Sequence, residues 1–119
     1  MELLTAPMRR QLVRNGRRSA EHAELGEDIP DHVPIVKLFT PDGACTWLLT
    51  ELDPLDEDLA FGLCDLGFGF PEFGSVRMSE LASLRGKLGL PVERDLHFSP
   101  DRTIAAYARQ ARDRGCILA

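Results

Sequence analysis

The sequence predicts an α+β fold, with a mainly antiparallel sheet built from residues 34–98 and with N-terminal and C-terminal helices packed on it. Short runs of β-forming residues follow one another with brief turns between them, and no helical segments alternate with them as they would in βαβ units. Helix start signals stand near both termini. Because 119 residues correspond to about one average domain, we expect a single domain over residues 1–119, with its core in residues 3–98.

The N-terminal helix is predicted from its start and stop signals. Thr5 is a residue type that caps helices, and Pro7 suits the first turn, where the helix needs no amide donor. Asn15-Gly16 is a typical C-terminal stop. Residues 17–32 follow without helical periodicity and contain a glycine and a proline, so we expect a charged loop there.

A hairpin is the clearest sheet element. Residues 34–40 and 44–52 are rich in β-formers and flank Pro41-Asp42-Gly43, in which proline fixes φ and glycine tolerates positive φ. Residues 59–66 and 73–78 indicate two further strands, joined by a glycine-rich connection.

The last third of the chain predicts a short helix, a strand and a longer helix. Ser79 is expected to cap the short helix, which stops at Gly86. Residues 92–98 alternate in polarity like a half-exposed strand. Ser99-Pro100-Asp101 combines an N-cap, a proline and an acid, so residues 100–115 are expected to form the C-terminal helix. Its apolar stripe is expected to consist of Ile104, Tyr107, Ala108 and Ala111.

Trp47, the only tryptophan, is expected to be the main aromatic anchor of the core, because it lies in mid-strand beside a tight turn. A surface tryptophan that binds a partner is the alternative. The cysteines are odd in number and far apart, which favours reduced, buried thiols over a redox or metal role, and we expect no cofactor. They are Cys45, Cys64 and Cys116.

Charge is segregated along the chain. Residues 9–18 contain five arginines and no acid, whereas residues 38–76 contain eight acids and no lysine or arginine. If these groups occupy separate faces, an acidic surface is available to a basic protein or to a second copy of the chain. The alternative is that the charges only keep the domain soluble. The eight acids are Asp42, Glu51, Asp53, Asp56, Glu57, Asp58, Asp65 and Glu72.

The pattern Glu93-x-Asp95-x-His97 has the most chemical content. Side chains two residues apart on a strand project to the same side, so two carboxylates and an imidazole can converge on a divalent cation. A fourth ligand, Asp65 or Glu72, would come from a neighbouring strand. The solvated polar face of an edge strand explains the same alternation and is the favoured interpretation.

Arg94 falls on the apolar side of the predicted strand 92–98, where an unpaired charge is unfavourable. We expect it to form an ion pair with a carboxylate. If that carboxylate lies in a cleft, the pair could orient an anionic ligand instead. The candidate partners are Glu51, Asp65, Glu72 and Glu80. The weak candidates for a binding site are Glu51, Asp65, Glu72, Arg85 and Arg94.

Catalysis by a nucleophile has little support. No serine or cysteine stands in an elbow or helix-start motif with a nearby histidine. His22 and His32 lie in the predicted charged loop without partners at ligand spacing. Gly67-x-Gly69 lacks the following helix and the lysine of a phosphate-binding loop. We therefore expect a protein that is not an enzyme.

Several sequence blocks occur in one order along residues 3–98. They are Leu3-Leu4-Thr5, Lys37 to Gly43, Thr46-Trp47, Thr50 to Asp53, Phe61-Gly62-Leu63, Pro71 to Gly74, Ser79-Glu80-Leu81 and Arg85 to Phe98. These blocks resemble the bacterial domain-of-unknown-function family twenty-nine fifty-eight. The resemblance implies a small cytoplasmic protein of a kind often found on plasmids and other mobile elements, and it carries over no activity. Residues 15–32 and the arginine-rich helix after Pro100 depart from the family pattern.

Three function classes follow. The first is a non-catalytic interaction or accessory protein that docks another protein through its acidic surface or through the aromatics Phe68, Phe70 and Phe73. The second is a nucleic-acid-associated protein that uses the arginines of residues 9–18 and 102–114, which the net charge of −5 does not favour. The third is a metal-dependent enzyme. No apolar run is long enough to span a membrane, so we expect no membrane partner and a cytoplasmic location.

Overall fold

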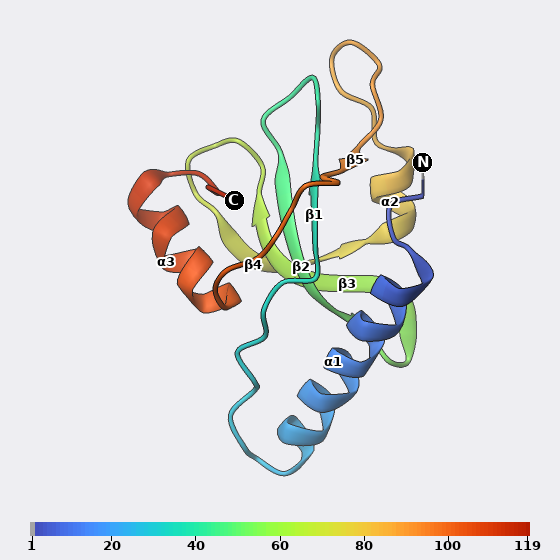
Figure 1. Ribbon diagram of the computed structural model, residues 1–119, viewed down its shortest axis with the longest axis vertical. Helices are drawn as coiled ribbons and strands as arrows, with labels where there is room; N and C mark the ends of the chain where they lie inside the picture. Colours follow the sequence, from blue (N-terminus) through green and yellow to red (C-terminus); the bar gives the residue numbers. More distant parts are fainter. Residues whose placement is uncertain (1) are drawn as a thin grey trace.

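A five-stranded sheet in the order β4-β3-β2-β1-β5 forms the centre of the molecule, and every neighbouring pair in it is antiparallel. The computed structural model describes residues 2–119 and confirms the predicted α+β class, with helices at both ends of the chain (Figure 1). The elements are α1 (Ala6–Glu24), β1 (Val36–Phe39), β2 (Thr46–Asp53), β3 (Asp56–Asp65), β4 (Glu72–Arg77), α2 (Met78–Ser83), β5 (Glu93–Arg94) and α3 (Ile104–Arg114).

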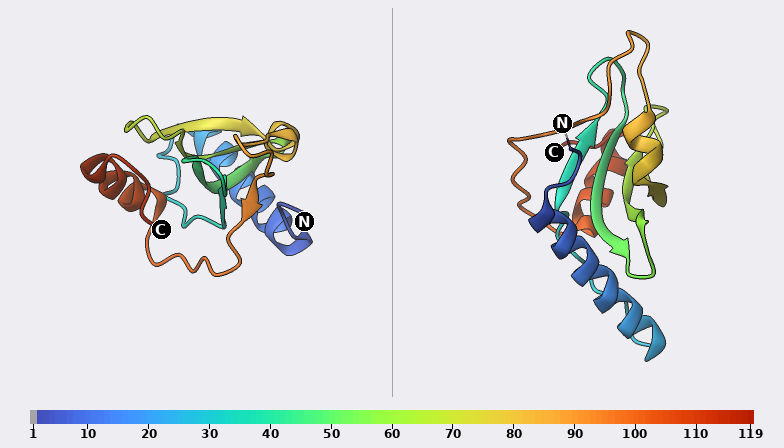
Figure 2. Two further views of the ribbon diagram at one scale, coloured as in Figure 1. Left: turned by 90° about the horizontal axis from the view of Figure 1, so that it is seen from above. Right: turned by 90° about the vertical axis from the view of Figure 1, so that its right-hand side faces the viewer.

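Two clusters of buried side chains hold helices on the two faces of the sheet, and α1 and α3 lie apart on different sides of the strands (Figure 2). The larger cluster joins α1 and α2 to the strands. Its core consists of Leu4, Leu12, Val13, Val36, Leu38, Trp47, Leu49, Leu52, Ala60, Met78, Leu81 and Val92. The smaller cluster, beneath α3, consists of Leu48, Leu63, Ile104, Tyr107, Ala108 and Ala111. The predicted stripe of the C-terminal helix is therefore confirmed.

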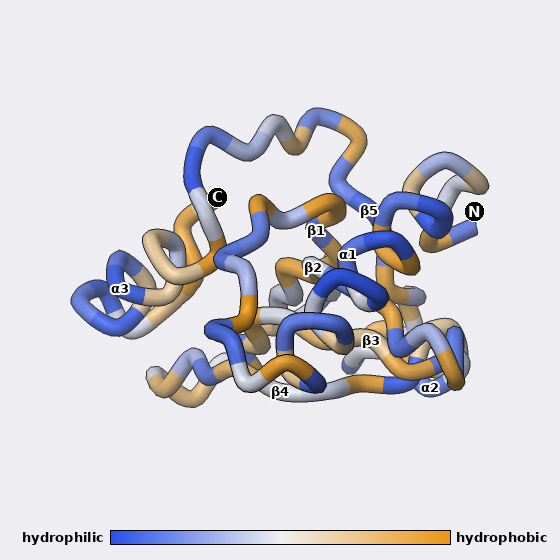
Figure 3. The backbone as a smooth tube through the Cα atoms, turned by 90° about the horizontal axis from the view of Figure 1, so that it is seen from below, coloured by the Kyte–Doolittle hydropathy of each residue, from blue (hydrophilic) through white to orange (hydrophobic). Residues whose placement is uncertain are grey.

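A bulge in β2 sets the direction of its side chains. The pairing with β3 shifts register between Leu49 and Glu51, which leaves Thr50 as an extra residue. Leu48 faces α3, while Leu49 and Leu52 both face α1. The predicted hairpin around residues 41–43 is confirmed, with Leu38 opposite Trp47. Hydrophobic stretches gather at the strands, and hydrophilic turns of α1 lie outside (Figure 3).

Trp47 is 4% exposed and belongs to the larger cluster, so the prediction of a buried tryptophan is confirmed. The prediction of buried thiols is wrong, because Cys45 and Cys64 are half-buried and Cys116 is exposed. All three cysteines are free. No helix within residues 2–119 is both long and apolar enough to cross a bilayer.

The first helix is longer than predicted. It continues through Asn15-Gly16 to Glu24, so residues 17–24 are helical and only the segment after them is a loop. The reason is tertiary contact. The Asn15 side-chain amide donates a hydrogen bond to the Thr50 carbonyl (2.9 Å), and the bare backbone of Gly16 sits against the Leu52 carbonyl oxygen, where a Cβ would overlap it.

The capping of α2 also differs from the prediction. Ser79 lies inside the helix, which begins at Met78 and ends at Ser83, before Gly86. The Asp58 carboxylate on β3 accepts hydrogen bonds from both the backbone amide (2.9 Å) and the hydroxyl (2.7 Å) of Ser79. A carboxylate from a distant strand therefore takes the place of the predicted local cap.

The predicted strand over residues 92–98 is wrong beyond Arg94. Only Glu93–Arg94 pair with β1, opposite Phe39 and Leu38. The Asp95 carboxylate then accepts a hydrogen bond from the His97 amide (2.9 Å), and this turn ends the strand because it takes the backbone out of the extended conformation.

Helix α3 begins at Ile104, later than the predicted start at residues 99–101. Its first amides are satisfied from the loop that follows α1. Ile104 donates to the His32 carbonyl (2.8 Å), and Ala105 donates to the Asp31 carboxylate (3.0 Å). The predicted end of this helix at residue 115 is confirmed, since Gly115 is its C-cap and adopts a left-handed conformation with φ of 75°.

Candidate functional site

The candidate metal pattern Glu93-x-Asp95-x-His97 is not assembled into a site within the described residues. Asp95 and His97 lie in a turn rather than on one face of a strand, and Asp95 forms an ion pair with Lys37 (3.3 Å). Asp65 is buried, and its two oxygens accept hydrogen bonds from the backbone amides of Gly67 and Ile117. In the part of the chain that the structure describes, no three His, Cys, Asp or Glu side chains are grouped to hold a metal ion.

The ion pair predicted for Arg94 is wrong as well. Arg94 donates to the Glu2 carbonyl (2.7 Å), and Arg85 donates to the carbonyls of Ala82 (3.1 Å) and Leu84 (2.8 Å). Carbonyls at a helix C-terminus carry partial negative charge, which explains why Arg85 settles at the end of α2. Of the proposed carboxylate partners, Glu72 and Glu80 are exposed, Asp65 is bound to backbone amides and Glu51 accepts from Ser19.

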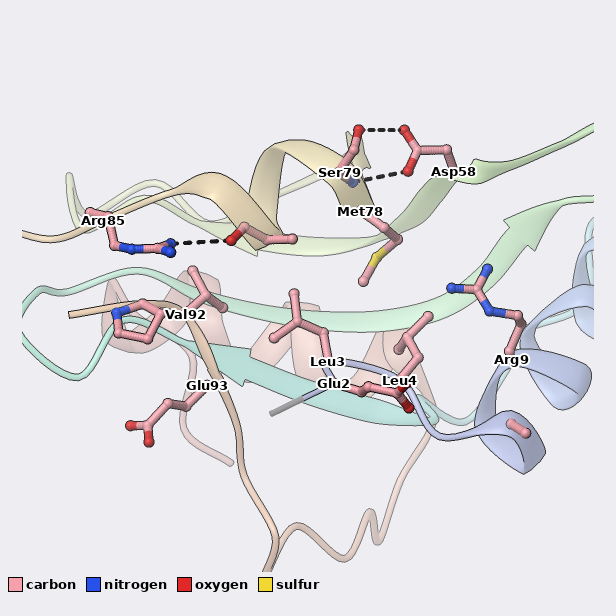
Figure 4. Close-up of a pocket in the computed structure, with 13 residues that line it drawn as sticks. Glu2, Leu3, Leu4, Arg9, Asp58, Met78, Ser79, Arg85, Val92 and Glu93 are labelled. Carbon is pink, nitrogen blue, oxygen red and sulfur yellow. Dashed lines mark hydrogen bonds between the residues drawn. The ribbon is translucent and has the colours of Figure 1, made fainter. Parts of the chain in front are cut away.

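A cleft of about 900 Å³ separates the N-terminal segment from α2 and β5 (Figure 4). Its apolar lining includes Leu4, Met78 and Val92, which belong to the larger core cluster. Its charged lining residues are Glu2, Arg9, Asp58, Arg85 and Glu93. The hydrogen bonds from Ser79, followed by the charge of Arg77, hold the pKa of Asp58 below its usual range. The Asp58 carboxylate is thus bound to Ser79, and the Arg85 guanidinium is bound to backbone carbonyls, so neither group is directed at a molecule in the cleft.

A second groove of about 640 Å³ lies between the second half of α1 and the end of the β2–β3 hairpin, and we call it the α1–β2 groove. Its ionisable lining groups are all carboxylates, from Glu24, Glu51 and Asp53. Its other lining residues are Gly16, Ser19, Ala20, Ala23, Ile29, Pro54, Leu55, Leu59, Ala60, Phe61 and Ser75.

A buried polar cluster borders this groove. The Ser19 hydroxyl donates to Glu51 Oε1 (3.0 Å) and lies 3.0 Å from Nε2 of His32. Ser19 and His32 are 7% and 8% exposed, and Glu51 is half-buried. The close contact of Gly16 with β2 brings Ser19, one turn further along α1, to the same strand.

The protein environment shifts the pKa of both titratable members of the cluster. Burial raises the pKa of the Glu51 carboxyl, the Ser19 hydroxyl opposes that rise, and the charge of Asp53 adds to it. Burial lowers the pKa of His32, as does the charge of Arg18, while Asp31 and the backbone of Asn15 act in the opposite direction. Both groups therefore favour their neutral forms more than they would in water.

The cluster contains a serine, a histidine and a carboxylate, as a catalytic triad does, but its hydrogen bonds do not run from serine through histidine to the carboxylate. A serine hydroxyl has one proton, and because Ser19 gives it to Glu51, His32 must supply the hydrogen in its contact with Ser19. A histidine in that tautomer cannot take the proton of Ser19, as a general base would. Ser19 also lies within α1, whose backbone amides are committed to the helix. The arrangement is best explained as a bridge that ties α1, the following loop and β2 together.

Sequence reasoning missed this cluster because it placed Ser19 and His32 in a loop and gave the histidine no partner. A signal was present: Leu12, Gly16, Ser19 and Ala23 recur at helical spacing across the predicted stop. Small residues at such spacing are typical of a helix that packs closely on its neighbour.

A third surface lies along β4, the edge strand of the sheet. A groove of about 540 Å³ there is lined by two carboxylates, from Glu72 and Glu80. Phe68 and Phe70 line it and are each 79% exposed. We call Leu66, Phe68, Phe70, Glu72, Phe73 and Glu80 the β4-edge surface. It includes Phe68, Phe70 and Phe73, the three aromatics that the sequence analysis named as possible docking residues.

The family model described as protein of unknown function, DUF2958, matches residues 3–118. The chain belongs to this family. The match reaches beyond the expected residues 3–98, and its range includes both segments that were expected to depart from the family pattern. No curated protein and no solved structure matches the chain. Membership of DUF2958 thus establishes the relationship without supplying an activity or a site.

The acids of residues 38–76 are spread over this DUF2958 domain and are mostly occupied. Asp42, for example, accepts from the Leu88 amide (2.7 Å), and Asp56 pairs with Arg77 (3.0 Å). Glu57 and Glu72 are exposed, and their carboxylates form no ion pair within residues 2–119, although the Glu57 backbone carbonyl accepts a hydrogen bond from Arg9 (3.4 Å). By contrast, the five arginines of residues 9–18 are all exposed on α1, and none of the ion pairs of residues 2–119 includes them.

Proposed function

We propose that this DUF2958 protein is a small non-catalytic interaction or accessory protein that binds a protein partner through the β4-edge surface. The observation that carries the proposal is the exposure of Phe68 and Phe70, at 79% each, beside an unpaired edge strand. Leaving a large aromatic side chain in water forgoes about 1.5–3 kcal/mol of burial free energy. Two adjacent exposed rings are therefore typical of a surface that another molecule covers.

The loop that carries these rings has a defined backbone. Gly67 and Gly69 have φ of 85° and 86°, a region that other residues rarely adopt. They alternate with Phe68 and Phe70, and Pro71 follows them and is buried. The glycines thus support a turn that holds both rings outward, which lowers the entropic cost of binding.

Charge indicates the kind of partner. The carboxylates at the β4 groove are Glu72 and Glu80, and no lysine, arginine or histidine of the described residues lines it, which supports a negative charge beside the aromatic rings. A partner with apolar and basic residues is complementary to it. An extended segment of such a partner, or of a second copy, has the free edge of β4 available for pairing. The cytoplasmic setting and the association with mobile elements are proposals that rest on the family resemblance.

The test compares partner capture by the wild-type chain and by Phe68→Ala/Phe70→Ala, with mass spectrometry of the retained proteins at low and high salt. Leu88→Ala is the matched control, since Leu88 is also exposed but lies far from β4 in the sequence. A partner that the control retains and the double variant loses supports the proposal. Equal capture by all three proteins contradicts it, and sedimentation of each protein detects self-association.

Nucleic-acid binding is the second candidate, because the arginines of residues 9–18 are exposed and lack carboxylate partners within residues 2–119. The net charge of −5 acts against it. Titration with duplex DNA at two salt concentrations tests it. Affinity that falls steeply with salt and is lost in Arg10→Ala/Arg14→Ala/Arg17→Ala would favour this second function over the first.

A further inference from the structure

The α1–β2 groove presents charge of one sign only. Glu24 of α1 and Glu51 and Asp53 of β2 are its ionisable lining groups, and no lysine, arginine or histidine among residues 2–119 lines it. Asp53 already accepts a hydrogen bond from the Leu55 amide (2.8 Å), and Glu24 is exposed. Glu51 is therefore the half-buried, partly desolvated carboxylate that a molecule bound in the groove would contact.

Glu51 has capacity to bind a further donor. An ionised carboxylate has about four lone-pair positions, whereas the described chain supplies Glu51 with one hydrogen bond, from Ser19. It belongs to none of the ion pairs of residues 2–119. Burial raises its pKa, which reflects a charge that the protein leaves uncompensated. A cation in the groove would supply the missing partner.

An apolar wall stands beside this carboxylate. Glu51 on β2 is directly opposite Phe61 on β3, so both side chains project from the same face of the sheet at close range. Phe61 stacks on Phe73, with ring centroids 6.0 Å apart, which fixes its ring. Ile29 and Leu55 add exposed apolar surface, and Ala20 and Ala23 leave room on the side of α1.

We propose that the α1–β2 groove binds a small organic cation, an ammonium or guanidinium group on an apolar or aromatic body, with the cation on Glu51 and the body against Phe61 and Ile29. The groove volume of about 640 Å³ falls in the range of small-molecule sites, about 300–1,000 Å³. An aromatic ring next to the carboxylate adds a cation–π contribution. A single half-buried carboxylate recognises a single cationic group, which is why a small molecule fits the site better than a protein surface does. The proposal is independent of the β4-edge surface.

The experiment titrates the full chain with three probes of similar shape: phenethylammonium, neutral 2-phenylethanol and anionic 3-phenylpropionate. Amide resonances near Ser19, Glu51 and Phe61 report binding in two-dimensional NMR spectra. We expect saturable shifts with phenethylammonium and affinities for the other two probes that are lower by about tenfold or more. Equal binding of the three probes, or shifts confined to other surfaces, would overturn the proposal.

Two variants and a control separate charge from fold. Glu51→Gln keeps the shape of the side chain and should weaken phenethylammonium binding by about tenfold. Asp113→Asn changes an exposed carboxylate on α3, outside the groove, and should leave binding unchanged. Ala20→Leu keeps Glu51 but fills the groove and should abolish binding. Unchanged affinity in folded Glu51→Gln contradicts the proposal. The proposal is also contradicted if the chain binds an arginine-containing peptide but does not bind phenethylammonium, since the groove would then be a site for a protein ligand.

Discussion

Gly16 of α1 lies directly against the backbone carbonyl of Leu52 on β2, at a distance that leaves no room for a Cβ. The contact brings the middle of α1 onto the sheet and places the second half of the helix beside the β2–β3 hairpin. Both the polar cluster around Ser19 and the α1–β2 groove depend on this approach, because each is built from the part of α1 that follows Gly16.

Gly16→Ala is therefore expected to lower the free energy of unfolding by about 2 kcal/mol or more, although alanine is the better helix former. Chemical denaturation measures the change. Gly74→Ala is the matched control, since a Cβ there would meet only Cys64 Sγ at 3.8 Å, an ordinary contact. A Gly16→Ala protein as stable as the wild type would show that α1 does not press on β2 as described.

The N-terminus of α3 depends on Asp31, which lies far from it in the sequence. Its carboxylate accepts the Ala105 amide, as an N-cap side chain would, while Thr103 at the cap position makes no such bond. Asp31→Ala should lower the free energy of unfolding by about 1 kcal/mol. Asp28→Ala, an exposed acid of the same loop, should have little effect in the same denaturation experiment. Similar losses in both variants would contradict the capping role.

The Gly16–Leu52 contact and the Asp31–Ala105 hydrogen bond show which parts of the fold a sequence alone cannot predict. The hairpin around residues 41–43, the buried Trp47 and the apolar stripe of α3 could be predicted because local turn chemistry and periodicity determine them. The end of α1 and the start of α3 could not, because residues distant in the sequence satisfy their backbone groups or press on them. Asn15-Gly16 has the composition of a helix stop, and only the presence of β2 makes it a packing contact.

The functional site could not be predicted from the sequence for the same reason: its residues depend on contacts that no local pattern reveals. The Glu93, Asp95 and His97 pattern required a strand that the Asp95 side chain itself ends by bonding to the His97 amide. The Ser19, His32 and Glu51 cluster joins a helix, a loop and a strand. Helical spacing could have placed Ser19 on the helix, but no local pattern indicates that His32 and Glu51 lie beside it.

Trp47 should dominate the stability of the core, since it is 4% exposed and packs in the larger cluster. Trp47→Ala is expected to lower the free energy of unfolding by about 3–5 kcal/mol. Phe68→Ala removes an aromatic ring that is 79% exposed and should change it by no more than about 0.5 kcal/mol. Native fluorescence resistant to acrylamide quenching is the second measurement. Strong quenching, or equal losses in the two variants, would contradict the assigned burial.

The polar cluster should make stability depend on pH in the acid range. The pKa of His32 is lowered from 6.5, first by burial and then by the charge of Arg18, so the unfolded chain binds this proton more readily than the folded protein does. The stability that His32 contributes is therefore present above pH 6.5 and is lost as the pH falls from there through its folded pKa. Glu51 acts in the opposite sense: its raised pKa means that its contribution is present below 4.5 and is lost as the pH rises through its folded pKa.

Thermal unfolding of three variants from about pH 8 to about pH 5 separates the two groups. His32→Gln should flatten the decline in Tm on the acid side, because it removes the group that gains a proton on unfolding. Glu51→Gln should make the decline steeper, because it removes the opposing contribution. His97→Gln changes an exposed histidine outside the cluster and should leave the profile as in the wild type. A profile that stays unchanged in His32→Gln, or that flattens equally in His97→Gln, would show that the buried cluster does not set the pH dependence.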